Sequence, residues 1–540
     1  MAEEGAAGPG RRAPPFTLDA VSEPSEPRPA AFPAAAEMRL SRTRLTAVVL
    51  VAVVLVAASA WTVRRSVGPT PPRPAVPWFA PYVDATLTPT YQFQLPSEDP
   101  ARQTVLGFVV ASRAAACTPS WGDYYSLGQA ATTLALDARI AQVRGDGGTP
   151  IVSFGGERNT GLAEACHDPA ALRAAYAQVI RRYHLSVVDF DVEGTAVSDT
   201  AATLRRARAL ASLQSAARAA HRRLAVWLTV PVARTGWTPA VTDLVRTTLR
   251  AGVDLAGVNV MAMDFGPPIA DQEAAVQQAV GAAAGQLSRV YRQVGIRLDA
   301  NQVWARLGVT VMIGQNDSAG EAFTTADARR LATFATRKHL ARVSAWSLNR
   351  DRQCGSEFPV VGAHSDTCSG VAQSTLQFSH ILAGLRGSAV RSAEPTPAPY
   401  VPSAVENPAT SPFPIWNATA AYAAGYKVVR EGYIYQAKWY NQGSDPAAAQ
   451  TQNPWQTPWE LIGPVLPGQH APKPPTLAAG TYPAWSPAVA YQAGAEVLRH
   501  GLPYVAKWYT KGDDPLAAAD GSVSSPWRAA YTLPGEPAAG

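Results

Sequence analysis

The sequence predicts an α/β protein: a (β/α)8 TIM barrel, then two small all-β modules, with a disordered N-terminal tail and one hydrophobic segment before the barrel. Three observations predict this order. Short apolar runs alternate with Ala- and Arg-rich helical patterns across residues 77–390, a pattern of about fifty residues occurs twice near the C-terminus, and Pro-rich stretches separate these parts. At 540 residues the chain exceeds one ordinary domain.

The N-terminal part supports two interpretations. Residues 1–43 are rich in Ala, Pro, Glu and Arg, which predicts a disordered tail, and residues 44–61 form an apolar segment with arginines on both sides. Read from Met1, this segment is an uncleaved signal anchor. Read from Met38, it is a secretory signal with a cleavage site at Ala58-Ser59-Ala60. Both interpretations make the rest of the chain extracellular, either secreted or anchored by a single N-terminal transmembrane helix.

Proline-rich stretches predict the domain boundaries. The predicted linkers are residues 62–76, 391–412 and 465–481, which leave a barrel at 77–390 and modules at 413–464 and 482–534.

Eight apolar runs are the predicted barrel strands, and helical patterns such as 168–183 and 200–221 lie between them. The runs are Phe79–Leu87, Val105–Ser112, Pro150–Gly156, Val187–Gly194, Leu224–Pro231, Leu255–Asp264, Leu307–Gly314 and Val343–Leu348.

The fourth run carries acids at every second position: Asp189, Asp191 and Glu193. Side chains alternate along a strand, so these acids share one face while the other face is apolar. Carboxylates so close together cannot all ionise, and at least one should keep its proton near neutral pH, as a general acid must. The alternative is an edge strand with a solvated acidic face.

Polar and aromatic residues also lie where other predicted strands end. Ser153 is in the third run, Met263 and Asp264 end the sixth, and Trp346 is in the eighth. Because the carboxyl ends of barrel strands form the active site, these four residues are further candidates. The alternatives are a strand-end cap for Asp264 and barrel packing for Trp346.

The four cysteines have no zinc-ligand spacing, and an extracellular chain favours disulfides. Three pairings are possible, and proximity favours Cys117 with Cys166 and Cys354 with Cys368. We predict no metal site and no cofactor.

The net charge of +6 is spread thinly, without a basic block interleaved with aromatics. Nucleic acid is therefore not an expected partner, and membrane contact is expected only through the N-terminal segment. We expect a monomer.

The two modules repeat an Ala-Lys-Trp-Tyr sequence, which contains Trp439-Tyr440 in the first copy and Trp508-Tyr509 in the second. Neighbours on a strand cannot both face one core, so at least one ring of each pair should be exposed. Exposed flat aromatics stack well on the apolar faces of sugar rings. These four residues are therefore candidate carbohydrate-binding residues.

Residues 77–390 resemble glycoside hydrolase family 18, whose D-x-x-D-x-D-x-E signature reads Ser186-Val187-Val188-Asp189-Phe190-Asp191-Val192-Glu193 here, with Ser186 in place of the first Asp. The motifs at Ser153-Phe154-Gly155-Gly156, Met261-Ala262-Met263-Asp264 and Trp346 extend the resemblance. The small modules are similar to family 5/12 carbohydrate-binding modules, which bind chitin.

This resemblance implies a chitinase that retains configuration by using the 2-acetamido group of its substrate as the nucleophile. Glu193 would be the general acid and then the base. Asp191 would hold the acetamido N–H, and Asp189 would share a proton with Asp191.

The resemblance also implies roles around these acids. Asp264 would position the acetamido group or water, and Trp346 would form the floor of the sugar pocket. Met263 stands where many family members have a tyrosine that binds the acetamido oxygen, so slower turnover is expected. The alternatives are an endo-β-N-acetylglucosaminidase, or a non-catalytic or weakly active chitin-binding protein on the same barrel.

Overall fold

The computed structural model describes residues 76–266, 269–355, 364–387, 402, 406–452, 456–471, 473–518, 524–533 and 535–536. The predicted tail at 1–43, the hydrophobic segment at 44–61 and most of two predicted linkers lie outside these residues. Among the helices of the described ranges, none has both the length and the apolar character that a membrane span requires.

The predicted barrel is present in the described part of residues 76–387, and all neighbouring strands around it are parallel. The first predicted strand is split in two. Its first piece pairs with the last barrel strand and its second piece pairs with β3, which closes the ring. The barrel strands are β1 (Trp78–Phe79), β2 (Tyr82–Asp84), β3 (Gln103–Ser112), β6 (Thr149–Gly155), β7 (Val187–Asp191), β8 (Ala225–Pro231), β9 (Leu255–Met261), β10 (Leu307–Met312) and β13 (Arg342–Trp346).

Six of the eight predicted strands end one to three residues earlier than expected, and two of these ends affect the site. β7 stops at Asp191 and β9 stops at Met261, so Glu193, Met263 and Asp264 lie in the loops just beyond the carboxyl ends of these strands. Asp264 has a left-handed backbone with φ of 50°, which ends the extended conformation of β9.

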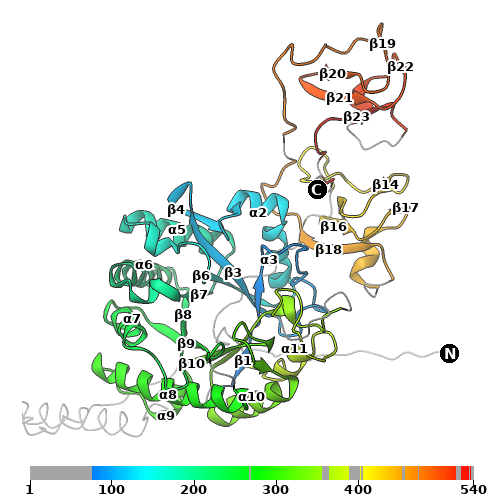
Figure 1. Ribbon diagram of the computed structural model, residues 1–540. Coiled ribbons are helices and arrows are strands. Elements are labelled where there is room, and N and C mark those ends of the chain that lie inside the picture. The colour runs from blue at the N-terminus through cyan, green and yellow to red at the C-terminus, as the bar shows by residue number, and fades with distance from the viewer. Residues whose placement is uncertain are drawn as a thin grey trace, which may run out of the picture. The chain divides into compact units, whose positions relative to one another are not determined.

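Helices surround the strands on the outer side of the barrel (Figure 1). Each of the five longest helices has an N-cap residue whose side chain accepts a backbone N–H of the first turn. These residues are Asp168, Asp199, Thr238, Asp271 and Thr324. The helices are α2 (Leu127–Thr133), α3 (Leu136–Gly145), α4 (Leu162–Ala165), α5 (Pro169–Arg182), α6 (Thr200–Ala219), α7 (Pro239–Arg250), α8 (Gln272–Gln293), α9 (Ala300–Trp304), α10 (Thr325–Lys338) and α11 (Gln377–Leu382), with short 3-10 turns η1 (Gly194–Ser198) and η2 (Leu348–Arg350).

Short strands lie in the loops of the barrel: β4 (Ala115–Trp121) and β5 (Tyr125–Ser126) continue antiparallel from β3, and β11 (Gly314–Gln315) pairs with β12 (Ala322–Phe323). Both predicted disulfides are confirmed. Cys117 in β4 bonds to Cys166 at the end of α4, and Cys354 bonds to Cys368.

The sequence repeat forms two copies of one small β fold. In each copy, a two-stranded and a three-stranded antiparallel sheet enclose a buried tyrosine and tryptophan: Tyr435 with Trp459, and Tyr504 with Trp527. The first copy contains β14 (Ala421–Tyr422), β15 (Lys427–Arg430), β16 (Tyr433–Ala437), β17 (Asn441–Gln442), η3 (Pro446–Gln450) and β18 (Trp459–Pro464); the second contains β19 (Ala490–Tyr491), β20 (Glu496–Arg499), β21 (Leu502–Ala506), β22 (Thr510–Lys511), η4 (Pro515–Ala518) and β23 (Trp527–Ala529).

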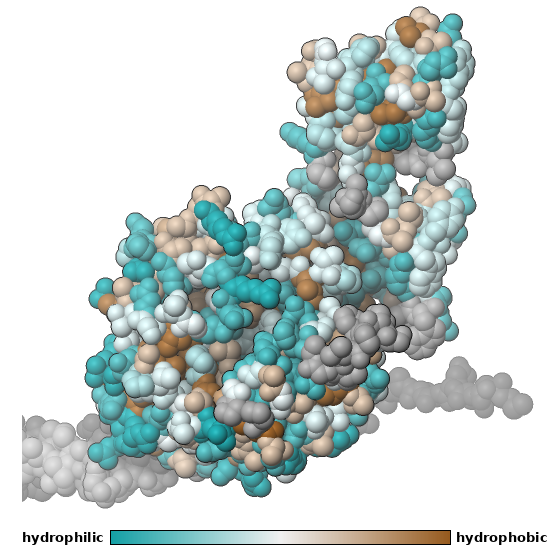
Figure 2. All heavy atoms as spheres, viewed as in Figure 1, coloured by the Kyte–Doolittle hydropathy of each residue, from teal (hydrophilic) through white to brown (hydrophobic). Residues whose placement is uncertain are grey.

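On the face shown in Figure 2, apolar residues are scattered among hydrophilic ones and do not gather into one broad patch.

Candidate active site

Asp189 is fully buried inside the barrel, and residues from four other strands hold its carboxylate. Arg342 Nη1 lies 2.6 Å from Oδ1, and the Thr229 hydroxyl donates to the same oxygen at 2.8 Å. Ser153 donates to Oδ2 at 2.7 Å and Tyr82 donates to it at 2.9 Å. Asp189 is therefore one half of a buried ion pair, and both of its oxygens are occupied.

Ser153 differs from the prediction. We expected it to bind substrate, but its side chain is fully buried and donates to Asp189. Ser153 and Asp189 are paired in register between β6 and β7, one layer below the open end of the barrel. The position of Ser153 near the end of a predicted strand made it a candidate, but the sequence does not show how deep along the barrel axis a residue lies.

Asp191 lies two residues further along β7 and is also buried. Its Oδ1 has no hydrogen-bond partner within the described structure. Burial raises the pKa of Asp191 well above its usual value, the negative charges of Glu193 and Asp189 raise it further, and Arg342 opposes them. Asp191 therefore favours its protonated form more than an exposed aspartate does. Within the described structure Asp191 shares no hydrogen bond with Asp189, whose two oxygens already accept hydrogen bonds from other residues.

Glu193 lies just beyond β7 and is only partly buried. Burial is the main reason that the pKa of Glu193 rises to about 7, and the negative charge of Glu157 adds to the rise. A carboxyl with this pKa is still substantially protonated at neutral pH. It can therefore give its proton to a substrate at the open end of the barrel.

A cavity of about 310 Å³ opens beside Glu193, between the loop that follows β6 and the loop that follows β7. Glu157 and Asn159 line it from the first loop, and Glu193 and Thr195 line it from the second. Buried aromatic rings of Phe154, Tyr176 and Phe190 also contribute to its walls.

Trp346, at the end of β13, is partly buried and stacks on Phe108 of β3, with ring centroids 5.7 Å apart. Tyr82 lies 6.1 Å from the same Trp346 ring. The sequence did not single out Phe108, because it lies within an apolar run where an aromatic residue is usual. The pairing register of β3 with β6 shifts between Leu106 and Val109. Alternation along an ideal strand does not predict such a shift.

Asp264 takes the position that we gave as its alternative, a strand-end cap. Its Oδ1 accepts the backbone N–H of Ser318 at 2.8 Å, and its own N–H donates to Asn316 at 3.4 Å. These bonds tie the end of β9 to the loop after β10, and burial raises the pKa of Asp264. Among the described residues, no hydrogen bond joins Asp264 to Asp189, Asp191 or Glu193. Met263, next to it, is partly buried.

The predicted rings of the two small modules are exposed, as expected. The exposed fractions are 46% for Trp439, 66% for Tyr440, 48% for Trp508 and 58% for Tyr509. The ammonium groups of Lys438 and Lys507 lie 4.8 and 4.5 Å from the centroids of the adjacent tryptophan rings.

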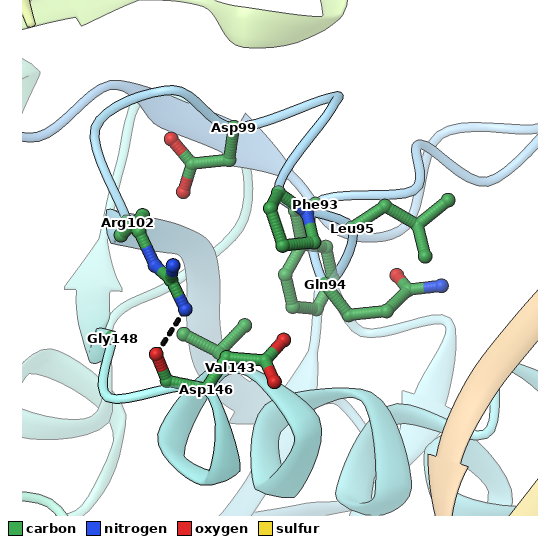
Figure 3. Close-up of a pocket in the computed structure, with 9 residues that line it drawn as sticks. Phe93, Gln94, Leu95, Asp99, Arg102, Val143, Asp146 and Gly148 are labelled. Atoms are coloured by element: carbon green, nitrogen blue, oxygen red, sulfur yellow. Dashed lines mark hydrogen bonds between the residues drawn. The ribbon is translucent and has the colours of Figure 1, made fainter. Parts of the chain in front are cut away.

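A second hollow, shown in Figure 3, lies at the opposite end of the barrel. Its residues Asp99 and Arg102 precede β3, while Asp146 and Gly148 precede β6, and Arg102 donates to the Asp146 carbonyl. Its volume is about 10 Å³, the size of one water molecule, so it is too small for a substrate. The described residues also include no cluster of His, Cys, Asp or Glu suited to a metal ion.

No family model matches the chain. Over 284 residues it is 33% identical to the probable bifunctional chitinase/lysozyme of Escherichia coli (strain K12), covering 52% of this chain and 31% of that protein. Over 279 residues it is 32% identical to endochitinase 11 of Metarhizium anisopliae, covering 51% of this chain and 52% of that protein. The chain thus spans about half or less of the length of these curated relatives.

Among solved structures, the catalytic domain of a hyperthermophilic chitinase from Pyrococcus furiosus has the same fold, with a TM-score of 0.50 and 23% identity over 59% of this chain and 97% of that chain. Both of these curated relatives are named as chitinases, and the likeness to the solved structure shows a shared fold.

Proposed function

We propose that the protein is a chitinase that hydrolyses β-1,4 linkages between N-acetylglucosamine units. The observation that carries this proposal is the graded set of acids along β7. Asp189 is in a buried ion pair, Asp191 is buried with one free oxygen, and Glu193 is at the open end with a pKa of about 7. This grading supplies one proton donor at the surface of the site and fixed charge beneath it.

In the proposed reaction, Glu193 protonates the glycosidic oxygen while the substrate's acetamido oxygen attacks the anomeric carbon. The bond to the leaving sugar breaks and a cyclic oxazolinium ion forms. Water then attacks the anomeric carbon and gives its proton to the Glu193 carboxylate. This opens the ring and retains the configuration.

Asp191 orients the acetamido group in this proposal, because its unpartnered Oδ1 is an acceptor for the acetamido N–H. Asp189 is a positioning residue, because its negative charge helps to raise the pKa of the neighbouring Asp191. Met263 supplies no hydroxyl to the acetamido oxygen, which should cost about 1.5 to 3 kcal/mol of transition-state stabilisation if no other donor replaces it.

We also propose that the two β modules bind chitin through the exposed rings of Trp439, Tyr440, Trp508 and Tyr509, and that the protein acts outside the cytoplasm. The exposure of the rings supports the first proposal. The two disulfides support the second, because such bonds persist in oxidising compartments.

Glu193→Gln tests the reaction. The amide has nearly the same shape but no proton to give, so release of oligosaccharides from colloidal chitin should fall by about 10²-fold or more. Thermal unfolding should show that the variant remains folded. Activity near the wild-type level in a folded Glu193→Gln protein would contradict the proposed role.

Two assays separate the alternatives. Turnover of a chromogenic chitooligosaccharide by the wild type would exclude a non-catalytic binding protein. Faster cleavage of a high-mannose glycoprotein than of chitin would instead favour the endo-β-N-acetylglucosaminidase.

A further inference from the structure

The cavity beside Glu193 contains one acid that the proposed reaction does not use. Glu157 lines this cavity from the loop after β6, and its side chain is exposed. No hydrogen bond or ion pair of its carboxylate is found within the described structure, although a negative charge next to the general acid is unfavourable.

Arg206, the cation in the cavity lining, and the lining acids Glu164 and Asp199 already have partners. Arg206 is paired with Glu164 at 3.1 Å, and Asp199 accepts the N–H of Ala202 at the start of α6. Arg113, which contacts the loop through Asn159, is paired with Asp123 at 3.0 Å. Glu157 therefore remains available for a positively charged group that enters the cavity.

The position of the cavity determines which sugar would enter it. Its lining includes Asp191, assigned above to the reacting sugar, and Glu193, but not Trp346, so the cavity begins at these two acids and extends along the loops after β6 and β7. A general acid protonates the oxygen between the reacting sugar and the leaving sugar, so these two sugars lie on opposite sides of the Glu193 carboxyl group. The space beside Glu193 that lies away from the reacting sugar therefore receives the leaving sugar.

The two sugars have different chemical requirements. The reacting sugar must carry an acetamido group, because that group is the nucleophile, but the leaving sugar takes no part in this step. A leaving sugar without its acetyl group has a free amine, which is an ammonium ion in mildly acidic solution and pairs favourably with a carboxylate.

We propose that Glu157 makes the leaving-sugar position selective for glucosamine, so that partly deacetylated chitin is a preferred substrate. This inference rests on the proposed function. A second feature supports a ligand here: Asp191 borders the same cavity, and its buried, unpartnered Oδ1, assigned to the reacting sugar, places the neighbouring sugar beside Glu157. Because Glu157 is exposed, solvent limits the effect to that of a surface ion pair, about a two- to five-fold preference.

The test uses limited hydrolysis of a randomly acetylated chitosan by the full-length protein in mildly acidic, low-salt buffer. Mass spectrometry then identifies the sugars at the two new chain ends. Glucosamine should be enriched about two- to five-fold at the new non-reducing ends, relative to its share in the polymer. About 1 M salt should remove most of this enrichment, since it screens exposed charges.

Glu157→Gln should remove the enrichment. The matched control is Asp254→Asn, which neutralises an exposed acid at the amino end of β9, at the opposite end of the barrel, and should leave the enrichment unchanged. The measured quantity is a ratio of end groups, so a change in overall rate does not affect it.

Equal end-group shares in the wild type, or enrichment that persists in Glu157→Gln or at high salt, would overturn the role of Glu157. Failure of the proposed function looks different. In that case the protein would release no products, or the new reducing ends would include glucosamine, which has no acetamido nucleophile.

Discussion

At the residue scale, the surroundings of Glu193 predict how the rate depends on pH. The group must be protonated to act as the acid, and its pKa is raised to about 7, first by burial and then by Glu157. The kcat/KM for soluble chitooligosaccharides should therefore fall as pH rises above about 7. Glu157→Gln removes the second cause, so the falling limb should move to lower pH by about a few tenths of a unit. If the falling part of the pH profile does not move, the charge of Glu157 does not affect the pKa of Glu193.

The ion pair of Asp189 with Arg342 gives a second prediction at this scale. Both side chains are fully buried, so Arg342→Met leaves a buried carboxylate without its counter-charge. The free energy of unfolding should fall by about 3 to 5 kcal/mol, as measured by urea denaturation. Arg246→Met is the control, because its partner Asp243 is about half exposed and water solvates the carboxylate that is left; it should cost less than about 1 kcal/mol. Similar losses in the two variants would contradict this account.

At the element scale, the approach of β6 to β7 depends on Gly155. This residue has φ of 109°, and a Cβ there would lie 2.0 Å from the Asp191 carbonyl oxygen. Gly155→Ala should therefore separate the carboxyl ends of the two strands, displace Asp191, and lower both stability and activity. Gly252→Ala is matched to it, since Gly252 has φ of 89° in open space. The control should cost about 1 to 2 kcal/mol, and Gly155→Ala at least about 2 kcal/mol more, by thermal unfolding.

The same scale shows what the sequence could predict. Apolar runs located the barrel strands, and alternation placed Asp189, Asp191 and Glu193 on one face of the fourth strand. It could not order them by depth, because depth is set by how strands from distant parts of the chain are staggered around the barrel. It also could not identify Arg342 as the partner of Asp189, since 153 residues separate them. The left-handed turn at Asp264 depends on the loop after β10, so an apolar run alone could not show that β9 ends at Met261.

At the scale of the whole molecule, the two β modules predict a bivalent protein if both bind chitin. When two linked modules bind one polymer, losing either should lower the apparent affinity by much more than half, because the effective concentration of the second module is lost. Trp439→Ala and Trp508→Ala should each weaken chitin binding by about tenfold or more, and the double variant should weaken it further. The rings are exposed, so thermal unfolding should change little.

The control for these variants is hydrolysis of short soluble chitooligosaccharides. The acids for this reaction lie at the open end of the barrel, and the rings lie in the modules, so the rate should be the same in all four proteins. Only about a twofold loss of binding in each single variant would mean that the modules bind independently, one at a time. No loss in the double variant would contradict the assignment of these rings to chitin binding. Loss of soluble activity would instead show that the substitutions reach the barrel.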